Sequence, residues 1–523
     1  MLTYYKARHP LHTLLLFLAL AIGMFYCISS FVNVFIKFEI AEIIIALGFL
    51  VIGLYGLIIK PYKEWKNLET HLYTICNLGK NRSFSAAWDR PLSSPVFRIL
   101  SLQRDTKNYY FIIRGEKIMS KVSEFIEKYF ADTVKYKTED EGSLIGLPYP
   151  YTTPCANELF IEFFYWDTYF TNVGLIAEGN IEQAKNNADN MAYIINKYGY
   201  MLNANSTNML ENQQSQPPFY FKMVEEIFDV TGDKEWLKES YKALTTEYKF
   251  WQTERIAPNG LNIYGPHKGY SEDKIARMSH YFTQRFKGYE FKDEEDKVNA
   301  AHTIFTMCES GWDCNSRFEN MGEFYNPVDL NSLLYGLEKA MAKFASVLEN
   351  GEEDLWNERA AQRKAKMLEL MYDKESGVLL DYNYKEQKLS PVVSFASIYP
   401  LFVGMLDSAD KEMELLRDKL MLKYGVSPCV PGEYNYALQW DYPNIWPPLQ
   451  YIAYVACKNY GYDDLAQKVA DTYIMLIDES FEKTGNLWEK YNGLNGSVAN
   501  EDYNAPKMMG WTAGMYMYFS HLK

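Results

Sequence analysis

Apolar residues recur at helical spacing through most of the chain after residue 154. Between residues 181 and 198 they fall on one face of a helix, at Ala184, Ala188, Met191, Ile194 and Ile195. The same spacing predicts helices over 221–228, 236–251, 330–348, 355–372, 448–460 and 463–481. Turn formers such as Thr231-Gly232-Asp233 separate these helices, and the alternation typical of strands is scarce. The pattern predicts an all-α fold.

Helices joined by short connections favour stacked helical hairpins. No fixed repeat period is visible, which disfavours a solenoid. We therefore expect residues 146–523 to form an α/α toroid with its site at the mouth, where the connecting loops converge.

The first 62 residues carry two long uncharged stretches, 11–36 and 43–59. Each approaches or exceeds the ~20 residues that span a bilayer. The first is too long for the apolar part of a signal peptide and lacks a small-x-small cleavage site. A buried soluble hairpin is the remaining alternative. We expect a membrane anchor of two transmembrane helices over 1–62.

Basic residues flank both stretches, at Lys6, Arg8, Lys60, Lys63 and Lys66. The positive-inside rule then places both flanks, and the rest of the chain, in the cytoplasm. Unpaired cysteines agree with that location. Sequons for N-glycosylation indicate the opposite one, at Asn81, Asn205 and Asn495. Residues 63–145 are polar and mixed and are expected to be a linker or accessory region, before a proline-rich stretch opens the main domain.

Composition excludes several classes of function. A formal net charge of -14 argues against nucleic acid as a partner, because phosphate binding needs a basic surface. The seven cysteines are scattered without a CxxC pair, and the seven histidines show no ligand spacing. We expect neither a metal nor a cofactor. The aromatic share of 16% suits a protein that stacks rings on flat apolar faces.

Residues 309–317, ESGWDCNSR, place one carboxylate beside a tryptophan. An apolar wall raises the pKa of a carboxyl group, so Asp313 is a candidate acid that stays protonated near neutral pH. Arg317 would act in the opposite direction. The alternative interpretation is a tight turn in which Asp313 caps the N-terminus of a helix.

Four further loop-like segments combine aromatic residues with carboxylates or amides, at 160–169, 203–218, 439–448 and 487–512. Proteins bind sugars with such sets, because aromatic rings cover the C–H faces while carboxylates and amides bond the hydroxyls. A small carbohydrate is the expected partner.

These segments resemble the trehalases, inverting glycoside hydrolases with an (α/α)6 barrel, over residues 154 to 521. The family motifs PGGRFxExYxWD and QWDxPxGWxP are approached by PCANELFIEFFYWD and QWDYPNIWPP, while ESGWDxxSR and EKY are complete. The resemblance implies that Asp313 is the general acid and Glu489 the general base. It also implies substrate-binding positions at Phe160, Trp166, Asp167, Asn203, Gln216, Arg277, Trp440, Trp446, Glu501 and Asp502.

The chain departs from the family at two arginines. Leu159 replaces the arginine of the first motif, and Gln214 stands where an arginine usually precedes the QPP element. Arginines that bond sugar hydroxyls contribute about 1.5–3 kcal/mol each. Another arginine could restore the lost contacts, with Arg82, Arg90 and Arg285 as candidates.

The sequence therefore favours a membrane-anchored inverting glycosidase that acts on trehalose or a related small α-glucoside. Both motif carboxylates are present, and a protein that only binds sugar has little need of an acid and a base. The alternative is a weakly active or inactive sugar-binding or sensor protein that retains the trehalase barrel.

Overall fold

The computed structural model describes residues 100–105, 108–113, 120–156, 159–265, 270–432, 438–500 and 503–522. The chain divides into two units, Met1–Lys117 and Ile118–Lys523. In the first unit, β1 (Leu100–Asp105) and β2 (Asn108–Ile113) form an antiparallel hairpin. The expected membrane spans, and Glu501 and Asp502, lie outside the described residues. Within the described residues, the structure contains no helix with both the length and the apolar character of a membrane span.

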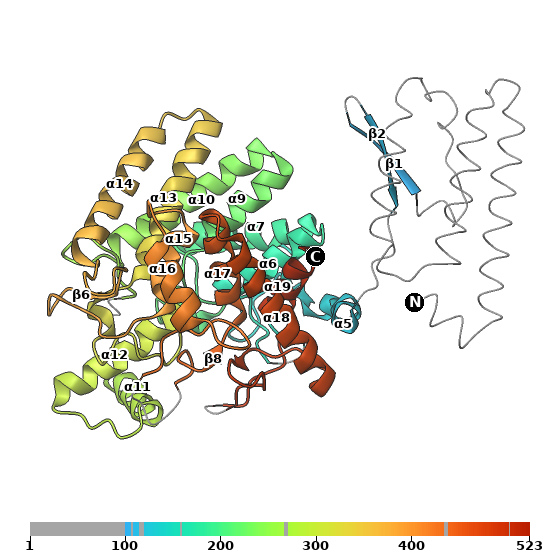
Figure 1. Cartoon of the computed structure of the whole chain (residues 1–523). Coiled ribbons are helices and arrows are strands. Elements are labelled where there is room, and N and C mark those ends of the chain that lie inside the picture. The colour runs from blue at the N-terminus through green and yellow to red at the C-terminus, as the bar shows by residue number, and fades with distance from the viewer. Residues whose placement is uncertain are drawn as a thin grey trace, which may run out of the picture. The chain divides into compact units, whose positions relative to one another are not determined.

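The second unit consists of helices in two layers, most of which Figure 1 labels, and the inner layer closes into a ring. In its described part, six helices form an inner ring in which each contacts the next and the last returns to the first. They are α6 (Tyr165–Ala177), α9 (Tyr220–Thr231), α13 (Val328–Leu348), α15 (Tyr399–Phe402), α17 (Pro447–Asn459) and α19 (Gly510–Ser520). This arrangement is the expected toroid.

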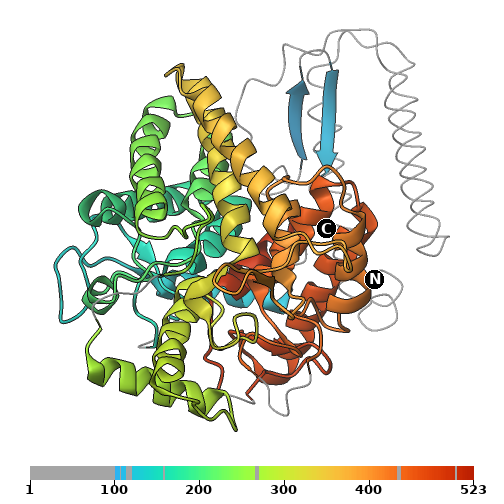
Figure 2. The same ribbon diagram turned by 90° about the vertical axis from the view of Figure 1, so that its left-hand side faces the viewer.

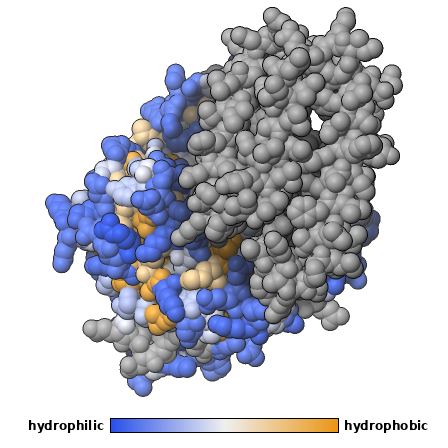
Figure 3. Space-filling view, turned by 45° about the vertical axis from the view of Figure 1, so that its right-hand side comes forward, coloured by the Kyte–Doolittle hydropathy of each residue, from blue (hydrophilic) through white to orange (hydrophobic). Residues whose placement is uncertain are grey.

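Outer helices alternate with the inner ones along the sequence. They are α5 (Lys121–Tyr129), α7 (Ile181–Tyr198), α10 (Lys234–Thr253), α14 (Glu353–Leu370), α16 (Asp410–Leu415) and α18 (Asp463–Thr484). The pairing of α13 with α14 is visible from two directions (Figure 1, Figure 2). On the face that Figure 3 shows, the outer surface of the described helices is mostly hydrophilic, with scattered apolar residues.

Two glycines close the inner ring. Gly174 of α6 and Gly514 of α19 bring the two helix backbones into direct contact, since a Cβ built on Gly174 would lie 2.5 Å from the Cα of Gly514. A side chain at either position would push the helices apart. The first and last inner helices therefore join where neither has a side chain.

Outer helices follow the sequence pattern closely. The apolar face predicted for α7 is fully buried, and Asn180 caps the helix by accepting a hydrogen bond from the backbone N–H of Gln183. Gly199 ends it in the left-handed conformation that glycine adopts without strain. Capping and one-sided burial explain why the prediction of residues 181–198 is confirmed.

The sequence predicts the inner helices α9, α13 and α17 but not α6 and α19. The interpretation of residues 165–169 and 510–512 as loop-like is wrong, because they form the first turns of α6 and α19. Every residue of α6 from Tyr165 to Leu175 is buried. A helix that is buried all round shows no polar face, so its sequence has no helical period.

Part of the expected linker belongs to the barrel. Helix α5 contacts α18, and its capping residue Ser120 hydrogen-bonds the hydroxyl of Tyr516 on α19 at 2.7 Å. Strand β3 (Val134–Lys135) pairs with β4 (Tyr151–Thr152). Residues 120–145 therefore supply an outer helix and an edge of the helical unit.

Two further helices, α11 (Glu272–Arg285) and α12 (Glu294–Ser310), pack against each other between α10 and α13. Short strands join the connecting loops: β5 (Tyr325–Asn326), β6 (Tyr382–Asn383) and β7 (Lys388–Leu389) form one sheet, and β8 (Asn444–Ile445) pairs with β9 (Tyr491–Asn492). The remaining helical turns are α8 (Thr207–Glu211), η3 (Phe130–Thr133), η4 (Gly322–Phe324), η5 (Phe395–Ile398) and η6 (Leu416–Leu420). The candidate site is built from these connections.

Candidate active site

Asp313 lies in the turn that follows α12. Gly311 ends that helix at a φ of 72°, and a Cβ there would come within 2.8 Å of the Trp166 ring. Glycine therefore meets two demands, a left-handed backbone and close contact with an indole. No helix begins at Asp313. The interpretation of this residue as a helix cap is wrong.

Burial raises the pKa of Asp313 to about 6. A hydrogen bond from the Cys308 thiol and the positive charge of Arg285 both lower the pKa, so they offset part of the effect of burial. A carboxyl group with a pKa of about 6 carries its proton in about a tenth of the molecules at pH 7, against fewer than about one in a thousand at the ordinary value of 3.8, and the protonated form is the one that acts as a general acid.

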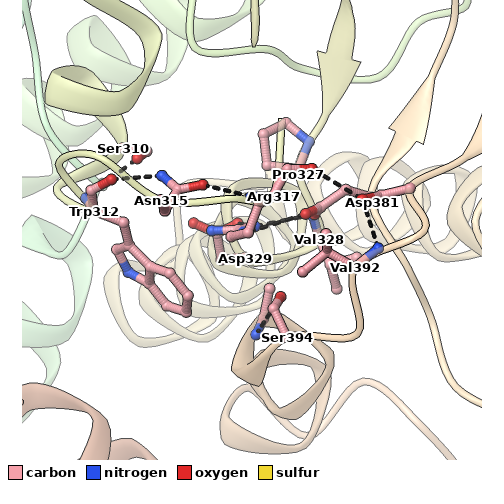
Figure 4. Close-up of polar contacts among 12 residues, drawn as sticks. Ser310, Trp312, Asn315, Arg317, Pro327, Val328, Asp329, Asp381, Val392 and Ser394 are labelled. Carbon is pink, nitrogen blue, oxygen red and sulfur yellow. Dashed lines mark hydrogen bonds and ion pairs between the residues drawn. The ribbon is translucent and has the colours of Figure 1, made fainter. Parts of the chain in front are cut away.

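Arg317 does not take the role expected of it. Its guanidinium is fully buried and donates to both oxygens of Asp381 at 3.0 Å and to Asp329 at 2.5 Å (Figure 4). It also lies 4.5 Å from the centre of the Trp312 ring. Burial alone would lower the pKa of Arg317, but the charges of Asp329 and Asp381 raise it above its ordinary value. Arg317 is therefore neutralised by two carboxylates from other segments, and the cation that acts on Asp313 is Arg285.

Glu489 reaches the same site through β9, which begins two residues later. Strand β9 pairs with β8, so the segment around Glu489 is joined to the segment that begins at Gln439. That segment binds the Asp313 turn directly, because the Ser316 N–H donates to Asp441 at 3.2 Å. The Tyr503 hydroxyl donates to Oε2 of Glu489. The short strands thus join the segment of Glu489 to the turn of Asp313, although the two are far apart in sequence.

Asp167 is the third carboxyl group of the site. It lies in the first turn of α6 and is 8% exposed. Burial and, to a smaller extent, the negative charges of Glu489 and Asp313 together raise its pKa to about 8. Asp167 is therefore protonated at neutral pH and can donate as well as accept hydrogen bonds. Because the charges of Glu489 and Asp313 both act on Asp167, the three carboxyl groups lie near one another, and we refer to them as the carboxyl cluster.

The tryptophans of the motifs are stacked on one another behind this cluster. Trp440 and Trp446 are parallel at 3.9 Å, and Trp312 stacks on Trp440 at 5.5 Å. Trp166 and Trp511 complete the group with tilted and edge contacts. All five are buried. They form a rigid apolar wall, the kind of setting that raises the pKa of a neighbouring carboxyl group.

The predicted amides hold backbone segments in place. Gln216 accepts from the Trp166 N–H at 3.1 Å, which satisfies a donor at the start of α6. Asn203 donates to the carbonyls of Ser215 and Cys308 at 3.1 and 3.2 Å. Both side chains therefore fix the loops around the carboxyl cluster.

The two positions that lack arginines differ in setting. Leu159 is 52% exposed, and the next residue, Phe160, has a positive φ of 54°. Gln214 is buried and hydrogen-bonds the Cys308 thiol. Arg277 lies on an exposed part of α11. Among the substrate-binding positions that the resemblance implies, Arg277 therefore lies on the surface, whereas the carboxyl groups are largely enclosed.

Three residues that interact with Asp313 or Glu489 have no role assigned by the motifs. Cys308 and Tyr503 hydrogen-bond Asp313 and Glu489 respectively, and Arg285 acts on Asp313 through its charge. Arg285 was named only as one of three candidates. The sequence does carry a signal for both, because Cys308 directly precedes Glu309 and Tyr503 directly follows Asp502.

Comparisons with known proteins agree with the fold. Neutral trehalase Nth1 from Saccharomyces cerevisiae is 25% identical and superposes with a TM-score of 0.59 over 72% of this chain and 74% of that one. A GH63 mannosylglycerate hydrolase from Thermus thermophilus, 16% identical, shares the fold with a TM-score of 0.52 over 76% of this chain and 99% of that one. The sequence profile of the family described as trehalase matches residues 96–522. The chain belongs to the trehalase family.

Proposed function

We propose that this member of the family is an inverting glycoside hydrolase with Asp313 as its acid and Glu489 as its base. The observation that supports this most is the pKa of Asp313, raised to about 6 beside a buried tryptophan wall. Asp313 donates its proton to the glycosidic oxygen as the bond breaks. Glu489 accepts a proton from the water that attacks the anomeric carbon on the opposite face, which inverts the configuration.

Substitution of each carboxyl group tests these roles. Asp313→Asn and Glu489→Gln should each lower turnover at least ~10²-fold, since a positioned acid or base contributes that much. Glu412 is a matched control, because it is a buried carboxyl group with a raised pKa on the outer helix α16. Glu412→Gln should keep turnover. NMR of the released sugar should show the inverted anomer first, and retention would refute the mechanism.

The substrate that we propose is trehalose or a related small α-glucoside. Leu159 cannot donate a hydrogen bond to a sugar hydroxyl, and the Gln214 side chain already hydrogen-bonds Cys308. One glucose subsite should therefore select its sugar less strictly. A panel of disaccharides measured by kcat/KM tests this. If no sugar is hydrolysed but trehalose binds in calorimetry, the sugar-binding alternative is correct.

We also propose that residues 1–62 anchor the enzyme in a membrane with the barrel on the cytoplasmic side. The support is the pair of uncharged stretches at 11–36 and 43–59 with basic flanks. Protease added to sealed right-side-out vesicles should leave the barrel intact. Digestion of the barrel, or a glycan on Asn495, would reverse the orientation.

A further inference from the structure

The end of α11 touches two segments of the site. Tyr281 accepts a hydrogen bond from the Cys314 thiol at 3.8 Å, next to the catalytic acid. One turn later, Arg285 donates from Nη2 to Oε1 of Gln439 at 3.2 Å, and its guanidinium carbon lies 5.9 Å from the centre of the Tyr281 ring. Arg285 is therefore held from two sides beside the turn that carries Asp313.

We propose that Arg285 is the arginine of this site, in place of Arg277, and that it positions Asp313 and sets the charge around it for proton donation. This inference rests on the proposed function. It goes further by assigning a role to a residue that lies outside every motif of the family found in the chain.

The physical argument is a balance of two effects on one carboxyl group. Burial favours the protonated form of Asp313, and a nearby cation favours the ionised form. Negative charge develops on the Asp313 carboxyl group as it gives up its proton, and a nearby cation stabilises that charge. The titratable or charged groups that face Asp313 come from several elements: Cys308 on α12, Cys314 in the turn, Tyr281 and Arg285 on α11, and Asp167 on α6. Of these, Arg285 is the cation.

The same side chains extend from Arg285 to the base. Gln439 accepts from Arg285 and donates from Nε2 to the Tyr503 hydroxyl at 3.4 Å. Tyr503 donates in turn to Glu489. A row of hydrogen-bonded side chains thus connects Arg285 with Glu489. The position of Arg285 therefore depends on the segments that carry Gln439 and Tyr503.

Helical geometry separates Arg277 from this role. Arg277 and Arg285 lie eight residues apart on α11, which corresponds to about 12 Å along a helix axis. Arg277 is exposed near the start of the helix, where it influences the pKa of Lys274. A side chain there cannot reach the segments that Arg285 contacts at the opposite end.

The test compares Arg285→Gln, Arg285→Lys and Arg277→Gln with the wild type. Arg285→Gln should lower kcat and move the basic limb of the kcat/KM profile upward by about one pH unit, the smallest effect expected for loss of a cation beside a carboxylate. In Arg285→Lys the basic limb should lie near its wild-type pH, because lysine keeps the positive charge. Arg277→Gln removes a cation from the same helix and should leave the position of the basic limb unchanged, and a limb that moves as far as in Arg285→Gln would overturn the assignment. Lower activity in Arg285→Gln with an unmoved limb would overturn the proposal.

A second measurement does not depend on turnover. The Asp313 carboxyl titration can be followed by 13C NMR in aspartate-labelled wild type and Arg285→Gln, with Asp313→Asn identifying the signal. The titration should move upward in the variant. An unchanged titration refutes the role of Arg285, whereas absent hydrolysis of every sugar with a moved titration refutes only the proposed function. Thermal melts establish that each variant is folded.

Discussion

The Tyr503 hydroxyl donates a hydrogen bond to Oε2 of Glu489, and the Tyr503 ring lies 3.9 Å from the ammonium of Lys490. The C-terminal segment therefore holds Glu489 twice. Tyr503 donates to its carboxylate, and the backbone N–H of Glu489 donates to the carbonyl of Pro506 at 3.1 Å. A donor to a carboxylate favours the ionised form, which is the form that accepts a proton from water.

Tyr503→Phe should lower kcat roughly tenfold, equivalent to about 1.4 kcal/mol. Phenylalanine keeps the ring that Lys490 covers and removes only the donor to Glu489. Loss of the donor raises the pKa of the base, so the acidic limb of the kcat/KM profile should move to higher pH. The control is Tyr462→Phe, which removes a hydroxyl bond to the exposed Asp410. A tyrosine that only supports structure would change activity without moving the limb.

Asp167 should make the barrel less stable as pH rises. Its pKa is about 8 in the folded protein against an ordinary value of 3.8. Between these values the folded state holds a proton that the unfolded state has released, so the free energy of unfolding falls with increasing pH. Asp167→Asn removes this dependence. The melting temperature of the variant minus that of the wild type should increase from pH 5 to pH 8. A difference that stays constant over this range would contradict the assignment.

Removal of Arg317 should destabilise the protein strongly. Arg317→Met leaves Asp329 and Asp381 buried without their cation, which costs about 3–5 kcal/mol in comparable pairs. The measurement is the free energy of unfolding in denaturant. Adding Asp381→Asn to Arg317→Met should recover part of the loss, because it removes one uncompensated charge. If the double variant is no more stable than the single one, the buried charges are not the cause.

Gly174→Ala should weaken the closure of the ring. The added methyl group overlaps the Gly514 backbone, and overpacking of this kind typically costs about 1–3 kcal/mol. Gly142→Ala is the control, since Gly142 also tolerates no side chain without strain at a φ of 62° but has open space around it. Thermal unfolding should show a larger loss for Gly174→Ala. Equal losses would mean that contact between α6 and α19 does not require glycine.

The amphipathic helices were determined by the sequence itself. Helix α7 has one apolar face, an asparagine cap and a terminal glycine, and each of these acts within the segment. The motif at 309–317 identified Asp313 in the same way, because its tryptophan and glycine are neighbours in the chain. Local interactions decide features of this kind, so local sequence is sufficient to predict them.

The surroundings of the acid were decided by tertiary structure. Arg317 is four residues from Asp313, yet its charge is taken up by Asp329 and Asp381, whereas Arg285 comes from another helix. Likewise, α6 shows no helical period because neighbours bury it all round. Charge and burial act through space and depend on which segments the ring brings together, so sequence distance gives no measure of either.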